Sequence, residues 1–116
     1  MSFKIECIAE GLYVAPQLAA EHMTALADAG IRSIINNRPD LEGGALQPAS
    51  RELEAAARAA GLQYEHLPVQ PAGHSEADAL RMVELVEGLP KPVLAFCRSG
   101  RRAAALYGFG RRLASG

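Results

Sequence analysis

Cysteine and arginine stand together in one short segment, Cys97-Arg98-Ser99-Gly100-Arg101-Arg102, whose residue types are suited to nucleophilic chemistry on an anion. An apolar run precedes the segment and an Ala-rich stretch follows it, which predicts a strand, a short turn and the start of a helix. That arrangement directs several backbone N–H groups and the positive end of the helix dipole at one point. We therefore predict an anion-binding loop.

Each residue of the loop has a predicted role. Cys97 is the expected nucleophile, because the N–H groups and the nearby guanidinium charge stabilise its thiolate form. Arg102 is the expected catalytic anion grip, since its planar fork can hold two oxygens at once. Gly100 permits the backbone to curl. The residues predicted to bind substrate are Arg98, Ser99, Gly100 and Arg101.

The two cysteines of the chain receive different interpretations. A free cysteine is often a small buried apolar residue, but the strand, Gly-containing turn and helix around Cys97 favour a catalytic role. Cys7 has no Gly loop or positive charge beside it and is interpreted as structural. The histidines lack ligand-like spacing, so we expect no metal and no cofactor; they are His22, His66 and His74.

The rest of the chain alternates strand-like and helix-like segments. Predicted strands cover 3–15 (two strands broken at Glu10-Gly11), 31–36, 62–69 and 92–96, and predicted helices cover 18–29, 49–60, 75–87 and 103–113. This alternation predicts an α/β fold, with a mostly parallel sheet of about five strands and helices on both faces. Ligands of such sheets bind beyond the C-terminal ends of the strands, where Cys97 falls.

Composition narrows the class of protein. The chain has 116 residues, 49% of them hydrophobic, so we expect one domain over 1–116. A formal net charge of -1 argues against nucleic-acid binding by bulk charge. No apolar run approaches the roughly 20 residues of a membrane span, and the N-terminus has no signal-peptide core, so we expect a cytoplasmic protein without a membrane partner. No residue pattern points to an oligomer interface.

Several stretches carry a resemblance to a known family. They are 11–14, 29–31, 34–40, 60–64, 66–69 and 97–102, of which Asn37-Arg38-Pro39-Asp40 and Cys97-Arg98-Ser99-Gly100 are the most specific. The chain resembles the phosphatase-like family of unknown function that is also found ahead of the β-lactamase-like hydrolase domain, with the cysteine-phosphatase fold. The resemblance implies that the strand ending at Asn36 lies beside the strand ending at Phe96. Arg38 and Asp40 would then lie near the loop, as candidates for supporting it.

The chain departs from true tyrosine and dual-specificity phosphatases at four points. Phe96 replaces a His before the nucleophile, four residues rather than five separate Cys97 from Arg102, and Ala103 follows the Arg. Residues 70–73 also lack the Asp that protonates the leaving oxygen in those enzymes. Three nearby residues could substitute for it, but they are better explained as a solvated loop residue and first-turn acids of a helix: His74, Glu76 and Asp78.

The six-residue loop resembles instead that of rhodanese-type sulfurtransferases, and the family is similar to proteins of sulfide and persulfide handling. Our leading hypothesis is therefore a sulfurtransferase: Cys97 takes a sulfane sulfur from a small donor, such as thiosulfate, and passes it to a thiol acceptor. This chemistry needs no acid for a leaving alkoxide. The alternative is hydrolysis of phosphate esters through a phosphocysteine. A third possibility is a non-catalytic binder of anions or phosphoproteins.

Overall fold

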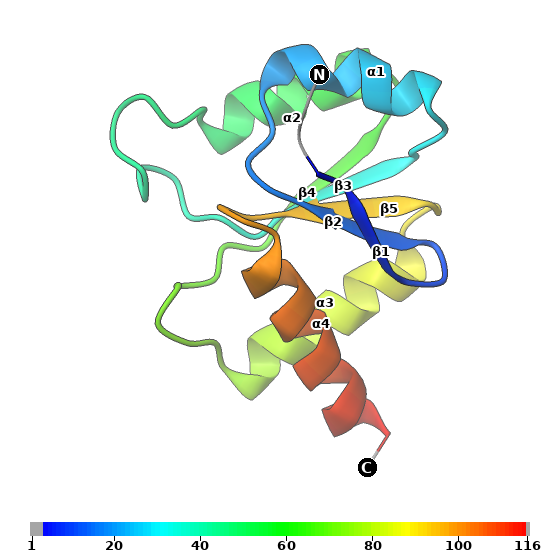
Figure 1. Ribbon diagram of the computed structural model, residues 1–116, viewed down its shortest axis with the longest axis vertical. Coiled ribbons are helices and arrows are strands. Elements are labelled where there is room, and N and C mark those ends of the chain that lie inside the picture. The colour runs from blue at the N-terminus through cyan, green and yellow to red at the C-terminus, as the bar shows by residue number, and fades with distance from the viewer. Residues whose placement is uncertain (1–3, 116) are drawn as a thin grey trace.

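The protein, described by a computed structural model over residues 4–115, has a five-stranded sheet between two layers of helices (Figure 1). The strands are β1 (Glu6–Ala9), β2 (Leu12–Ala15), β3 (Ser33–Asn36), β4 (Gln63–His66) and β5 (Val93–Phe96). Their order in the sheet is β1-β2-β5-β3-β4. All neighbouring strands are parallel except β1, which pairs antiparallel with β2. The predicted α/β fold and mostly parallel sheet are confirmed.

Two helices cover each face of the sheet. A 3-10 turn, η1 (Ala20–His22), leads into α1 (Met23–Asp28), which lies with α2 (Ser50–Ala59) above the sheet in Figure 1. The lower face is covered by α3 (Glu76–Gly88) and α4 (Arg101–Ala114). Every predicted helix is present in the described part of the chain, although α4 begins two residues earlier than predicted. Arg101 and Arg102 therefore belong to its first turn.

The predicted strands are shorter in the structure: β3 begins at Ser33 rather than at 31, and β5 begins at Val93 rather than at 92. The strand predicted over 62–69 covers only Gln63–His66. The following residues still approach the sheet, since the Leu67 and Val69 N–H groups donate to the Asn36 and Asn37 carbonyls at 2.8 and 3.0 Å. The first predicted strand begins at Glu6, and the predicted start at Phe3 lies outside the described residues.

The central strand β5 is buried on both faces and divides the core in two. Val93 and Ala95 pack into the cluster under α3 and α4, whereas Leu94 and Phe96 pack into the cluster under α1 and α2. This confirms the interpretation of the run as a fully buried strand. Cys97 continues the alternation and joins the α3–α4 cluster. The sheet thus fixes the position at which the Cys97 loop begins.

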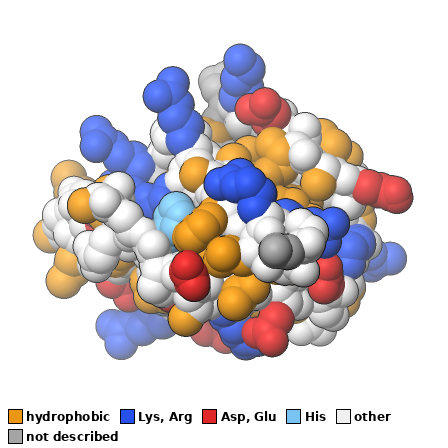
Figure 2. All heavy atoms as spheres, turned by 90° about the horizontal axis from the view of Figure 1, so that it is seen from below, with side chains coloured by type: hydrophobic (Ala, Val, Ile, Leu, Met, Phe, Trp, Pro, Cys, Tyr) orange, Lys and Arg blue, Asp and Glu red, His pale blue; other side chains and the backbone are white. Residues whose placement is uncertain are grey.

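Helix α4 packs closely against α3, which fixes the orientation of its N-terminus. A Cβ at Gly110 would collide with the Ala79 carbonyl and the Val83 side chain, so only glycine allows this approach. At the surface, Arg111 forms an ion pair with Glu87 at 3.3 Å. Figure 2 shows that this face mixes apolar side chains with charges of both signs. Within residues 4–115 no helix has the length and apolarity to cross a membrane.

Candidate active site

The turn between β5 and α4 places a sulfur atom at the N-terminus of a helix. Gly100 is the N-cap of α4 and has a left-handed φ of 92°. Its N–H donates to the Cys97 Sγ at 3.1 Å. The left-handed backbone angle favours glycine, and a Cβ at this position would lie in tight contact with the Ala15 carbonyl oxygen, at 3.3 Å. The dipole of α4 therefore points its positive end at the sulfur.

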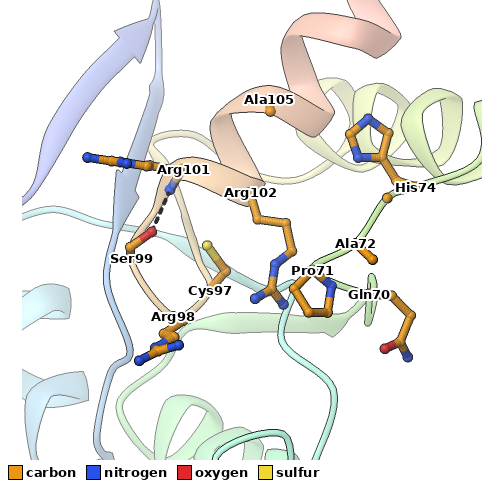
Figure 3. A pocket seen from close by; sticks show the side chains of 11 residues that line it. Gln70, Pro71, Ala72, His74, Cys97, Arg98, Ser99, Arg101, Arg102 and Ala105 are labelled. Atoms are coloured by element: carbon orange, nitrogen blue, oxygen red, sulfur yellow. Dashed lines mark hydrogen bonds between the residues drawn. The ribbon is translucent and has the colours of Figure 1, made fainter.

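Cys97 lines a pocket of about 380 Å³ (Figure 3). Its residue exposure is only 1%, so its surroundings leave little of it open to solvent. The pocket walls come from 70–74 on one side and from the loop and first turns of α4 on the other.

Arg102 is held by one end of its guanidinium group, which leaves the other edge free. Nη1 donates to the Glu42 Oε1 at 2.8 Å and to the Val69 carbonyl at 3.0 Å, and Nη2 donates to the Glu42 Oε2 at 3.0 Å. Three of its five N–H bonds are thereby used. The remaining two, on Nε and Nη2, lie on the same edge and have no acceptor among residues 4–115. Such an edge is a fork that matches two oxygens of one anion.

Glu42 is the functional residue that the sequence analysis missed. Besides Arg102, its carboxylate accepts a bond from Arg38 Nε at 2.7 Å. The hydrogen bond from Arg102 is the main cause that lowers the pKa of Glu42, and Arg38 adds to it against the opposing effect of burial. Glu42 is therefore ionised at neutral pH. Glu42 follows Arg38 by four residues in the sequence, a spacing that indicates an ion pair only within a helix. The residues between them are not helical, so the sequence did not indicate this pair.

The structure connects Arg38 to the loop but not Asp40. The Arg38 guanidinium touches Glu42 and also donates to Gln17 Oε1 at 3.0 Å. The carboxylate of Asp40 instead accepts from the Ser50 backbone N–H at 2.8 Å, at the start of α2. An acid in that position stabilises a helix N-terminus. Arg38 thus shares the Glu42 carboxylate with Arg102, whereas Asp40 caps the N-terminus of α2.

Exposed side chains of the loop form the rim of the pocket. Arg98, Ser99 and Arg101 are all exposed. Ser99 Oγ accepts a bond from the Arg101 backbone N–H at 3.4 Å, and in Figure 3 the Arg101 side chain extends away from the Cys97 sulfur. The guanidinium groups of Arg98 and Arg101 contact no carboxylate within the described residues. Of the predicted site residues, Gly100 contacts the Cys97 sulfur through its N–H, and the pocket is lined by Cys97, Arg98, Ser99, Arg101 and Arg102.

The described lining of the Cys97 pocket contains no carboxylic acid. His74 belongs to this lining, and its ring packs on Phe109 with centroids 5.3 Å apart. Glu76 and Asp78 lie in the first turn of α3, where the Asp78 N–H donates to Ser75 Oγ at 3.0 Å. Residues 4–115 contain no group of three or more His, Cys, Asp or Glu side chains arranged to hold a metal ion.

The strand order and the Cys-to-Arg loop between the central strand and α4 define a protein of the cysteine-phosphatase fold. The comparison with known families is more specific. The chain belongs to the family described as the phosphatase-like domain of beta-lactamase hydrolase-like proteins, which matches residues 4–114. The resemblance seen in the sequence motifs is thereby confirmed.

Relatives and solved structures agree with this assignment. A beta-lactamase hydrolase-like protein of Agrobacterium fabrum is 37% identical over 106 residues, covering 91% of this chain and 24% of that protein. The chain thus spans about a quarter of the length of the curated relatives it matches. A candidate phosphatase from Neisseria meningitidis is 36% identical, with a TM-score of 0.86 over 97% of this chain and 78% of that one.

A more distant structure shares the fold alone. The core catalytic domain of the PP-IP phosphatase Siw14 of S. cerevisiae is 16% identical, with a TM-score of 0.72 over 97% of this chain and 67% of that one. The family and the Neisseria structure are described as phosphatase-like, so they favour the phosphate-ester alternative over our leading sulfurtransferase hypothesis. They give no support to rhodanese-like chemistry or to sulfur donors as substrates.

Proposed function

We propose that this domain hydrolyses phosphate esters through a phosphocysteine formed on Cys97. The observation that carries the proposal is that Cys97 and Arg102 line one pocket, with the Gly100 N–H bonded to the Cys97 sulfur. These groups provide a nucleophile and donors for the equatorial oxygens of a phosphoryl group. The phosphatase-like family and the fold of its neighbours support the same reaction.

The reaction has two steps. The Cys97 thiolate attacks phosphorus, so that an S–P bond forms while the bond to the leaving oxygen breaks and its electron pair stays on that oxygen. Arg102 and the N–H groups of the loop hold the charge on the phosphoryl oxygens throughout. A water molecule then attacks the phosphocysteine and loses a proton to solvent. The S–P bond breaks, inorganic phosphate leaves and the thiolate is restored.

The leaving group receives no proton from a carboxylic acid in this site. Glu42 is ionised and bonded to two arginines, and the described pocket lining supplies no other carboxyl group. A general acid contributes roughly 10²–10⁴-fold to such a step. Esters whose leaving oxygen is already a weak base should therefore be the better substrates.

Parallel assays with two substrates test the proposal against the sulfur hypothesis. Wild type, Cys97→Ser and Cys7→Ser are each given p-nitrophenyl phosphate, or thiosulfate with a thiol acceptor. We expect phosphate release by wild type and Cys7→Ser and its loss in Cys97→Ser, because Cys7 is exposed and does not line the pocket.

Two other outcomes would contradict the phosphatase proposal, and each would establish a different function. Cys97-dependent sulfur transfer without phosphate release would establish the sulfurtransferase. Tight phosphate binding with turnover of neither substrate would establish a non-catalytic binder. Trapping the intermediate by rapid acid quench and mass spectrometry identifies the group on Cys97 directly.

A further inference from the structure

A second hollow of about 600 Å³ lies beside the Cys97 pocket. It is lined by Arg38, Glu42, Gly43, Pro71, Arg98 and Arg102. Pro71, Arg98 and Arg102 line both hollows, whereas Cys97 lines only the first. The two spaces are therefore adjacent, with the guanidinium of Arg102 in the wall between them.

The second hollow is strongly positive for its size. Three arginines line it, and one carboxylate, that of Glu42, partly balances them. Arg98 is exposed and has no carboxylate partner within residues 4–115. In Figure 3 its side chain extends below the sulfur, on the opposite side from His74. The chain as a whole has a formal net charge of -1, so this concentration of positive charge is local.

The proposed reaction uses only part of this charge. One phosphoryl group on Cys97 engages the loop N–H groups and the free edge of Arg102, and it lies in the first pocket. Arg38 lines only the second hollow and Arg98 lines both, so positive charge borders a space that the reacting phosphoryl group does not fill. Arginine forks of this kind bind phosphate oxygens with charge-assisted hydrogen bonds.

We propose that this second hollow is a subsite for a second phosphate group of the substrate. The inference rests on the proposed phosphatase function and deepens it: the substrate is a small molecule with two phosphates close together, one over Cys97 and the other between Arg98 and Arg38. A substrate with one phosphate leaves the subsite empty and binds more weakly.

Binding to the Cys97→Ser variant tests the subsite without turnover. Calorimetry at fixed pH and ionic strength gives the dissociation constants of inorganic phosphate and of methylenediphosphonate, a non-hydrolysable pair of phosphate-like groups. We expect the diphosphonate to bind at least about tenfold more tightly, the gain expected from one charge-assisted contact. Adding Arg98→Gln should remove most of this preference.

Arg101→Gln is the matched control, because Arg101 lines the first pocket but not the second. It removes the same charge and should weaken both ligands alike, which leaves their ratio within about twofold. Arg98→Lys keeps the charge but not the fork, and it should fall between wild type and Arg98→Gln. Arg98 is exposed, so unchanged thermal unfolding is expected and checks that the variants fold.

The outcomes separate this inference from the function on which it rests. Equal affinity for the two ligands, or a preference that survives Arg98→Gln, would overturn the subsite even if p-nitrophenyl phosphate is hydrolysed. An equal loss of the preference in Arg101→Gln would also overturn it, because general charge would then explain the ratio. Absence of Cys97-dependent hydrolysis would instead refute the phosphatase, and the ratio would still report on the hollow.

Discussion

The carboxylate of Glu42 holds the guanidinium of Arg102 end-on, with Oε1 2.8 Å from Nη1 and Oε2 3.0 Å from Nη2. This contact joins the loop after β3 to the first turn of α4. Because both terminal nitrogens are engaged, the side chain cannot rotate without breaking a paired bond. The Nε edge is consequently held in one orientation, and Glu42 acts as a positioning residue for Arg102.

Glu42→Gln should lower kcat for p-nitrophenyl phosphate by about tenfold to a hundredfold, the effect of 1.4–2.7 kcal/mol of lost orientation. A glutamine offers only one oxygen, and its NH₂ group faces a donor of Arg102. Removal of the negative charge by itself would strengthen anion binding and lower KM. A fall in kcat without a lower KM therefore distinguishes orientation from simple electrostatics.

Glu54→Gln is the matched control, since Glu54 forms an exposed ion pair with Arg58 on α2. Its kinetics should be those of wild type, because exposed pairs contribute little. An unchanged kcat with a lower KM in Glu42→Gln would mean that Glu42 only competes with anions for Arg102.

The same carboxylate predicts sensitivity to acid. The pKa of Glu42 is lowered in the folded state from its ordinary value of 4.5, chiefly by the hydrogen bond from Arg102. Its contribution to stability is therefore fully present above about pH 4.5 and is lost as pH falls through the lowered folded value. Urea unfolding at a series of pH values should show wild type losing more stability than Glu42→Gln across this window. Parallel curves for the two proteins would contradict the assignment.

Local sequence patterns predicted the Cys97 loop. They did not predict Glu42, whose position is set by the long connection between β3 and α2. The apolar run before Cys97 and the glycine within the turn sufficed to predict the strand, the turn and the helix. The pairing of β3 with β5 was implied by the resemblance to the family. The position of the Glu42 side chain depends on the conformation of the connection between β3 and α2. Gln47 fixes that path, by accepting from the Gly43 N–H at 2.7 Å and donating to the Pro39 carbonyl at 2.8 Å. No periodicity encodes such contacts, so Asp40 was placed near the loop and Glu42 was overlooked.

Gly100→Ala should reduce both stability and activity. The substitution imposes a left-handed φ of 92° on alanine and brings its Cβ 3.3 Å from the Ala15 carbonyl oxygen. We expect a loss of about 1–3 kcal/mol in unfolding free energy. The shift needed to relieve the contact moves the Gly100 N–H away from the Cys97 sulfur, so kcat/KM should fall about tenfold or more.

Gly61→Ala separates backbone strain from the effect on the site. Gly61 has a φ of 86° and nothing within 4 Å of an added Cβ. An alanine there has the same unfavourable backbone angle as at position 100, but its Cβ makes no close contact. We expect it to be destabilised by about 1 kcal/mol with unchanged kinetics. Equal activity losses in the two variants would show that the Gly100 geometry is not important for the reaction.

Tyr64 supports the start of the Arg38 loop through a buried network. Its hydroxyl accepts from Asn36 Nδ2 at 3.0 Å and lies 2.9 Å from Ser50 Oγ, while Asn36 Oδ1 accepts from the Arg38 N–H at 2.9 Å. Tyr64→Phe leaves two buried polar groups without this partner and should cost about 1–3 kcal/mol. Tyr13→Phe, which removes a hydroxyl without a hydrogen bond within residues 4–115, should cost less in the same thermal unfolding measurement. Equal losses would argue against the network.

The lack of a carboxylic acid around Cys97 predicts a steep dependence on the leaving group. In a series of aryl phosphates, kcat/KM reports the step in which the S–P bond forms, even where hydrolysis of the phosphocysteine limits kcat. Between p-nitrophenyl phosphate and phenyl phosphate, whose leaving group resembles tyrosine with a pKa of about 10, we expect a fall of roughly 10²–10⁴-fold. His74 is the titratable group of the lining whose protonation could flatten this series, but its ring packs on Phe109. His74→Asn should therefore leave the dependence unchanged. A shallow series in wild type that becomes steep in His74→Asn would contradict the prediction and identify His74 as the acid.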